Sequence, residues 1–210
     1  NFLKIAPAYG IRPLLGIDFR NDHQTLYVGI AKNNEGYREL NEYLSYHLEH
    51  KKDFPSRAPY LKGCYFIYPL KQALLLFENS LLQNYEKIGV GVITFNRFRF
   101  SKFNAPLYRE QLVFFQAVSF RDKKDWNAHR LLRAIDHNTL LSKLESCQQG
   151  DENDRMLPME KVRELFEDFV YILDNTKNLI EACEVSFSFG KGLNQNLRTY
   201  GKSQAGDEKL

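Results

Sequence analysis

The residues of this chain that could perform chemistry are few and scattered. Asp18 stands at the end of a short apolar run, where a carboxylate could bind a metal ion but also commonly caps a turn or pairs with an arginine. The cysteines are odd in number and have no CxxC pair, which argues against a disulfide framework and a thiolate zinc site. They are Cys64, Cys147 and Cys183.

The histidines lack the His-x-His and His-x-x-x-His spacings of metal sites. His129 lies on an expected helical stripe, and we interpret it as a half-buried, hydrogen-bonded histidine rather than a ligand or a general base. Surface positions account for the other four, which are His23, His47, His50 and His137. There is no Gly-x-Ser-x-Gly nucleophile motif, and residues 190–192 (GKG) lack the rest of a phosphate loop.

Residues 96–103 (NRFRFSKF) interleave basic and aromatic side chains. Arg97, Arg99 and Lys102 could contact phosphates while the neighbouring rings stack on bases. The alternative is a strand or loop whose aromatic side chains point inward and whose cations lie in water. We favour this alternative and keep a nucleic-acid contact as the competing hypothesis.

The first half of the chain alternates short apolar runs with helical segments, which is typical of an α/β fold. Strands are predicted at 13–19, 25–31, 63–68, 88–95 and 112–120, and helices at 33–47 and 70–82. The run at 112–120 is apolar enough to be a central strand covered on both faces.

The second half reads as helical. Trp126, His129, Leu132 and Ile135 fall on one stripe after Asp122. A further helix is predicted to open at Pro158 and to continue its core stripe through residue 173. Residues 147–155 between these helices read as a surface loop.

The overall composition is that of a folded protein, with 43% hydrophobic and 26% charged residues among 210. The net charge of +3 permits nucleic-acid binding, but a dedicated DNA-binding domain usually has a more concentrated basic excess. No apolar run reaches the ~20 residues of a membrane span, so we expect no membrane partner and a reducing cytoplasm. Because the chain opens at Asn1 without methionine, we interpret it as an internal fragment.

Four stretches, the last in two parts, resemble the alpha subunit of bacterial DNA polymerase III. They are residues 9–18 (YGIRPLLGID), 30–40 (IAKNNEGYREL), 128–135 (AHRLLRAI), and 155–157 (RML) with 174–183 (DNTKNLIEAC). Together they span nearly the whole chain in the family's order and spacing, although residues 63–111 match less clearly.

The resemblance implies an α/β fold of PHP type, which is a distorted β/α barrel. Residues 1–145 would form the partial barrel, and residues 146–187 a helical part that leads toward the polymerase domain. Residues 188–210 would be a linker or the start of the polymerase region.

The same resemblance bears on metal binding, because PHP strand ends can hold metal ions for phosphoester hydrolysis. The family's early His-x-His and later Asp-His would precede Asn1. Its Asp-x-His before the Ala-His helix falls here on Ala117, Val118 and Ser119, and methyl and hydroxymethyl groups are poor metal ligands. The family's glutamate corresponds to Asp18. We therefore expect a degenerate, metal-free site with a structural role; the alternative is a metal-dependent PHP phosphoesterase or exonuclease.

The implied parent is a DNA-directed DNA polymerase, a nucleotidyltransferase of DNA replication that uses Mg²⁺. The paired aspartates of a polymerase palm are not visible as a motif, so this segment is expected to be inactive alone and to hold no cofactor. Its expected partners are the polymerase core of the same chain and DNA through the parent. A proofreading exonuclease subunit and a sliding clamp are further candidates.

Overall fold

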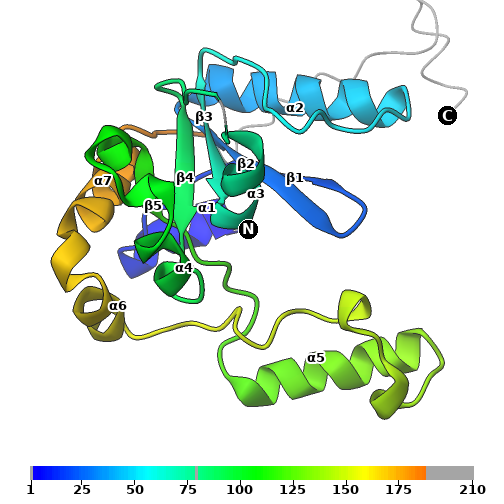
Figure 1. Cartoon of the computed structure of the whole chain (residues 1–210). Helices are drawn as coiled ribbons and strands as arrows, with labels where there is room; N and C mark the ends of the chain where they lie inside the picture. The colour runs from blue at the N-terminus through cyan, green and yellow to red at the C-terminus, as the bar shows by residue number, and fades with distance from the viewer. Residues whose placement is uncertain (1, 79, 188–210) are drawn as a thin grey trace, which may run out of the picture.

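The computed structural model describes residues 2–78 and 80–187, and an open sheet of five strands lies at its centre (Figure 1). The strands are β1 (Gly16–Asn21), β2 (Gln24–Ala31), β3 (Cys64–Pro69), β4 (Glu86–Val90) and β5 (Leu112–Phe114), in that spatial order. The first three strands pair antiparallel, and β3, β4 and β5 run parallel. The predicted α/β class is confirmed.

The described residues also form seven α-helices and several short 3-10 helices. The α-helices are α1 (Phe2–Ile5), α2 (Asn34–Glu49), α3 (Leu70–Leu76), α4 (Phe95–Arg99), α5 (Lys123–Asp136), α6 (Met159–Leu165) and α7 (Val170–Glu181). Among the described residues, no helix is both long and apolar enough to cross a membrane.

The sheet buries side chains on both of its faces because successive strand residues point to opposite sides. Phe66 and Tyr68 of β3 belong to the larger core, which α2, α3 and α4 help to cover. Ile67 lies on the opposite face, in a smaller cluster that includes Leu179 of α7 and Cys183. The helices therefore form a layer on each side of the sheet.

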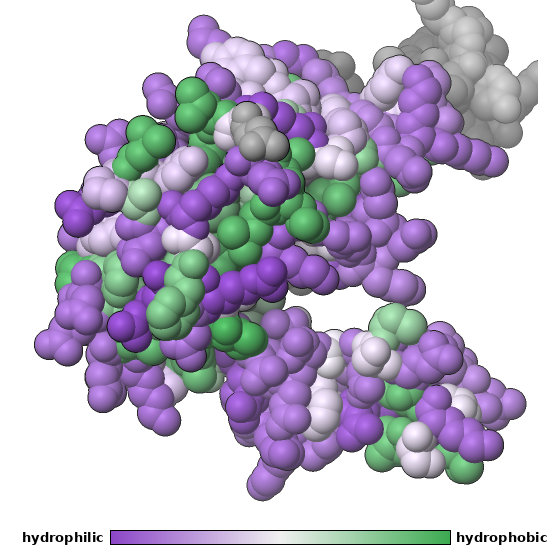
Figure 2. Space-filling view, viewed as in Figure 1, coloured by the Kyte–Doolittle hydropathy of each residue, from purple (hydrophilic) through white to green (hydrophobic). Residues whose placement is uncertain are grey.

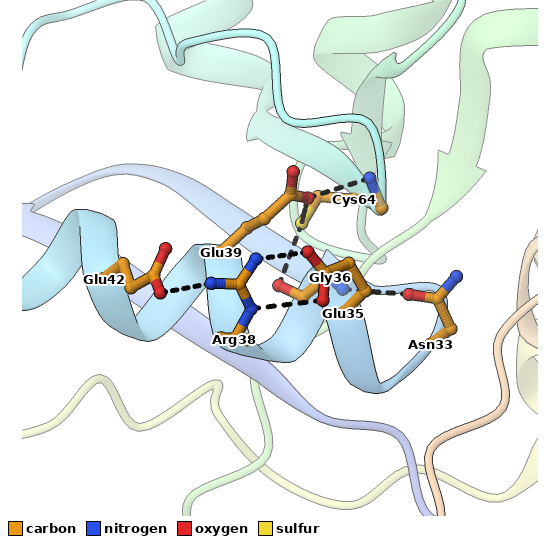
Figure 3. A network of polar contacts seen from close by, with 8 residues as sticks. Asn33, Glu35, Gly36, Arg38, Glu39, Glu42 and Cys64 are labelled. Carbon is orange, nitrogen blue, oxygen red and sulfur yellow. Dashed lines mark hydrogen bonds and ion pairs between the residues drawn. The ribbon is translucent and has the colours of Figure 1, made fainter.

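Helix α2 is fixed to the start of β3 by a polar network (Figure 3). Asn33 caps the helix, because its Oδ1 accepts a hydrogen bond from Gly36 N at 2.9 Å. From the same helix, Glu39 Oε2 accepts from Gly63 N at 2.9 Å, and Cys64 Sγ donates to Gly36 O at 3.3 Å. Asn33 thus caps the start of the helix, and Glu39 and Gly36 join it to the start of β3.

Helix α5 lies in an arm, residues 117–157, that projects from the sheet (Figure 1). The two chain segments that join the arm to the body are bonded to each other: Phe120 N donates to Asp154 O at 2.9 Å, and Met156 N donates to Phe120 O at 3.0 Å. Figure 2 shows apolar surface on this arm. Leu132 and Ile135, which were predicted to share a stripe with His129, are 66% and 67% exposed.

The prediction of a central strand at 112–120 is wrong. Strand β5 contains only Leu112–Phe114 and lies at an edge of the sheet. Helix α7 covers this edge, where Asn175 Nδ2 donates to Leu112 O at 2.9 Å and Phe114 N donates to Thr176 Oγ1 at 2.7 Å. An edge strand needs such partners for its free backbone groups, and side chains of α7 supply them.

Other predicted bounds were too long. The strand predicted at 88–95 ends at Val90, and the helix predicted at 70–82 ends at Leu76. The helix predicted from Pro158 is divided into α6 and α7 by a 3-10 turn at Glu167–Phe169. The linker predicted at 188–210 lies outside the described residues.

Candidate functional site

Asp18 is paired with an arginine on its own strand. Arg20 donates from Nε and Nη2 to Asp18 Oδ2 at 2.7 and 2.5 Å. This hydrogen bonding raises the pKa of Arg20 above its usual value. Of the two roles considered for Asp18, ligand or arginine partner, the structure shows the second.

Ala117 and Ser119 lie on the segment that leaves β5, and both are exposed. Ser119 N donates to Asp154 O at 2.8 Å, so this segment runs beside the returning segment of the arm. Burial and the charge of Asp151 raise the pKa of Asp154, and Arg20 acts in the opposite direction. The charges of Asp18 and Asp154 both raise the pKa of Arg20. Asp18 lies on β1 at one edge of the sheet, and Asp154 lies in the arm that follows β5 at the other edge.

Arg20 forms its ion pair with Asp18, and its charge acts to lower the pKa of Asp154, with which it forms no ion pair in the described part of the chain. No cluster of three or more His, Cys, Asp or Glu side chains suited to a metal occurs in the described ranges 2–78 and 80–187. The chemistry that these side chains offer at this place is charge pairing.

The five histidines lie in three kinds of environment. His129 is half-buried and its Nε2 accepts from Gly150 N at 3.1 Å, as predicted. The surface position predicted for His47 is wrong, because its ring is buried, stacks on Phe54 with centroids 4.8 Å apart and has Nδ1 3.0 Å from Tyr43 O. The remaining three, His23, His50 and His137, are exposed.

The three cysteines are free thiols that lie in different environments. Cys64 and Cys183 are buried and Cys147 is exposed. Burial raises the pKa of the Cys64 thiol to about 12, with a smaller contribution from Glu39, and burial also raises the pKa of Cys183. A raised pKa keeps a thiol protonated and poorly nucleophilic at neutral pH.

The basic and aromatic segment at 96–103 is helical rather than a strand or loop, since Phe95–Arg99 forms α4 and a 3-10 turn follows it. Its orientation agrees with the favoured interpretation: Phe98 and Phe103 are buried, while Arg97 and Arg99 are exposed. Phe100 is the exception at 90% exposed.

Lys102 has a structural contact. Its Nζ donates to the carbonyl oxygens of Phe77 and Glu78, the second at 2.9 Å. These carbonyls follow the last turn of α3, where a cation is stabilising. In residues 96–103, Arg97 and Arg99 therefore form no ion pair with the described part of the chain, whereas Lys102 binds the C-terminal end of α3.

The sequence analysis missed a buried ionic site at the start of β4. Glu86 is fully buried, and Arg57 donates to its two carboxylate oxygens from Nε at 2.8 Å and from Nη2 at 2.6 Å. Tyr68 Oη and Gln83 N donate to the same carboxylate at 3.1 and 2.8 Å. A glutamate next to an apolar run was the available signal, but its partner lies 29 residues away in the sequence.

Comparison with known proteins supplies no relative, because no protein-family model matches the chain and no curated protein matches it. The structure brings three features to this region: an arginine-paired carboxylate within β1 rather than at the expected strand end, two exposed small residues after β5, and a projecting arm.

Proposed function

We propose that this chain is the PHP-type segment of a bacterial DNA polymerase III alpha subunit, and that it braces the polymerase region of the parent in cytoplasmic DNA replication. The observation that carries the proposal is the occurrence of four resembling stretches in the family's order along nearly the whole sequence. The parent would catalyse DNA synthesis with Mg²⁺, and this segment would act as a platform without a metal of its own.

The pairing of Asp18 supports a structural role. Both nitrogens of the Arg20 fork that bond to Asp18 lie within 2.7 Å of one carboxylate oxygen, so a metal ion would have to displace a charge-assisted pair. Two positions at which the resemblance requires an aspartate and a histidine, Ala117 and Ser119, offer no strong ligand. The guanidinium then supplies locally the positive charge that a metal would supply.

The projecting arm supports a bracing role. Leu131, Leu132 and Ile135 of α5 and the following Leu140 are all more than half exposed. Apolar side chains gathered on one element usually mark a contact surface. We expect this face of α5 to pack against the polymerase region, with a proofreading subunit or a sliding clamp as further candidates for the assembly.

The test is a binding measurement between this chain and the polymerase region of the same parent, made as a separate protein. We expect a complex at micromolar concentration that is detected by pull-down and by analytical ultracentrifugation. The double variant Leu132→Glu, Ile135→Glu should weaken it at least tenfold, because two charges would have to be buried in an apolar contact.

The matched control is Asn127→Glu, which adds a charge at an exposed position near the start of the same helix. Its affinity should stay within twofold of the original. No complex at tens of micromolar would contradict bracing, and equal loss in both variants would place the contact elsewhere.

A further inference from the structure

A hollow of about 620 Å³ lies where β2 ends and where β3 and β4 begin. It is lined by Lys32, Tyr60, Tyr65, Gln83, Asn84 and Tyr85. Antiparallel pairing of Ala31 with Cys64 brings the end of β2 beside the start of β3, and the parallel strand β4 starts on the other side of β3. Three separate segments therefore converge on this one end of the sheet, and the volume is that of a small-molecule site.

Two lysines lie near the Tyr65 ring: Lys32 lines this hollow, and Lys87 lines an adjoining hollow that shares Tyr65. Lys32 Nζ lies 4.1 Å and Lys87 Nζ lies 5.9 Å from the centroid of the Tyr65 ring. Within the described ranges, neither ammonium forms an ion pair with a carboxylate; their polar contacts are backbone carbonyls, Lys62 O at 3.5 Å and Glu110 O at 3.2 Å. Glu110 is the carboxylate whose charge acts on Lys87.

This charge arrangement favours an anion. Lys87 is half-buried, and burial lowers its pKa, with the positive charge of Lys32 adding to the effect. The two ammonium charges therefore repel each other, and a phosphate bound at Lys32 in this hollow would relieve that repulsion. The neighbouring ring adds a cation–π contact but no negative charge.

The aromatic lining favours a planar group beside the anion. Tyr60 and Tyr85 form a T-shaped pair with centroids 5.1 Å apart, and Tyr60 is 67% exposed. In a T-shaped pair, the ring that contributes its edge keeps both faces open toward other groups. The side-chain amides of Gln83 and Asn84 line the same hollow, and each can both donate and accept a hydrogen bond.

We propose that this hollow binds a nucleoside phosphate unit, with the phosphate at Lys32 and the base against the tyrosine rings. The unit is either a free nucleotide or one nucleotide of a single strand, because both offer the same phosphate and ring. The site lies apart from Arg97 and Arg99, and it does not rest on the assignment to a polymerase.

The experiment titrates the full chain into fluorescein-labelled oligothymidylate and follows anisotropy, with a parallel calorimetric titration of thymidine monophosphate. Tyr60→Ala should weaken oligonucleotide binding roughly tenfold, as removal of a stacking ring usually does. Lys32→Gln should weaken it and should lower the slope of log affinity against log salt by about 0.7, the value for one phosphate contact on a single strand.

The chain offers a matched control pair. Lys52 Nζ lies 4.9 Å from the Tyr46 ring, so it forms the same kind of contact on a surface that is not part of the hollow. Lys52→Gln and Tyr46→Ala should leave both the affinity and the salt slope unchanged. All four variants should keep the thermal unfolding midpoint of the original chain, which shows that loss of binding is not loss of fold.

Each outcome decides the proposal. If both the oligonucleotide and the monophosphate bind, and Lys32→Gln weakens both, a free nucleotide is a sufficient ligand for the hollow. If only the oligonucleotide binds, the ligand is one nucleotide of a single strand. No binding of either probe overturns the proposal. Binding that Lys32→Gln and Tyr60→Ala leave unchanged also overturns it, because the contact would then lie elsewhere.

Discussion

Gly36 in the first turn of α2 and Gly63 just before β3 lie in direct backbone contact. A Cβ built on Gly63 would stand 2.6 Å from both Cα and N of Gly36, and one built on Gly36 would clash with the Gly63 carbonyl group. Neither glycine has a positive φ. The requirement for glycine is thus one of space between a helix and a strand, rather than of backbone conformation.

Gly36→Ala should therefore destabilise the chain. The added methyl group meets backbone that cannot rotate away, so we expect the free energy of unfolding to fall by about 2 kcal/mol or more. Urea unfolding followed by circular dichroism measures this. Ser45→Ala, at an exposed position of the same helix, is the control and should change stability by less than about 0.5 kcal/mol. An unchanged midpoint for Gly36→Ala would contradict the close contact.

Arg57→Met should destabilise the chain because it leaves the buried Glu86 carboxylate without its charged partner. We expect a loss of about 3 kcal/mol, within the range for breaking a buried ion pair. The control is Arg38→Met, which removes contacts with Glu35 and Glu42 on the exposed side of α2 and should have little effect. Similar losses in both variants would show that the Glu86 carboxylate is not isolated from water.

The raised pKa of Cys64 predicts a pH dependence of stability. The ordinary pKa of a cysteine thiol is 9.0 and that of Cys64 in the folded chain is about 12, so the folded chain holds this proton more tightly than the unfolded chain. Its contribution is complete below pH ~9 and is lost as the pH rises toward ~12. The stability difference between the original chain and Cys64→Ala should therefore shrink over this window.

Chemical denaturation at pH 8 and at pH 10.5 measures this difference. Cys147→Ala is the control, because Cys147 is exposed and should give no pH-dependent difference. A Cys64→Ala difference that is constant with pH would mean that the thiolate is accommodated in the folded chain.

Metal content tests the structural role proposed for Asp18. We expect substoichiometric zinc and manganese in the chain purified without chelator, measured by elemental analysis, and a gain of metal in Ala117→Asp, Ser119→His. Arg20→Met in that background should increase the gain, because it frees the Asp18 carboxylate. Asp18→Asn in the same background should remove the gain. Stoichiometric metal in the unmodified chain would contradict the proposal.

The sequence predicted those elements whose signals are local. The helix predicted at 33–47 is α2 (Asn34–Glu49), and the strand predicted at 25–31 lies within β2. The failures arise where a pattern has two readings. Phe95 and Phe98 are three residues apart and both buried, which is helical spacing, yet the interleaving of basic and aromatic residues over 96–103 favoured a strand or loop.

The remaining errors concern contacts that no local pattern contains. The apolar run at 112–120 suggested a central strand, but β5 is an edge strand. Asn175 and Thr176 of α7, far along the chain, form hydrogen bonds with its free backbone groups. The pairing of Arg57 with Glu86 is likewise set by the fold. The candidate ligand positions could be named from the resemblance, whereas the competing Arg20 contact became visible only in three dimensions.

The arm that carries α5 leaves and re-enters the body through two segments bonded at Phe120, Asp154 and Met156. These hydrogen bonds, rather than α5, therefore set the distance between the point where the arm leaves the body and the point where it returns. The arm is a closed excursion of the chain, so its length can vary, or it can be exchanged for a short turn, without changing the separation between β5 and α6.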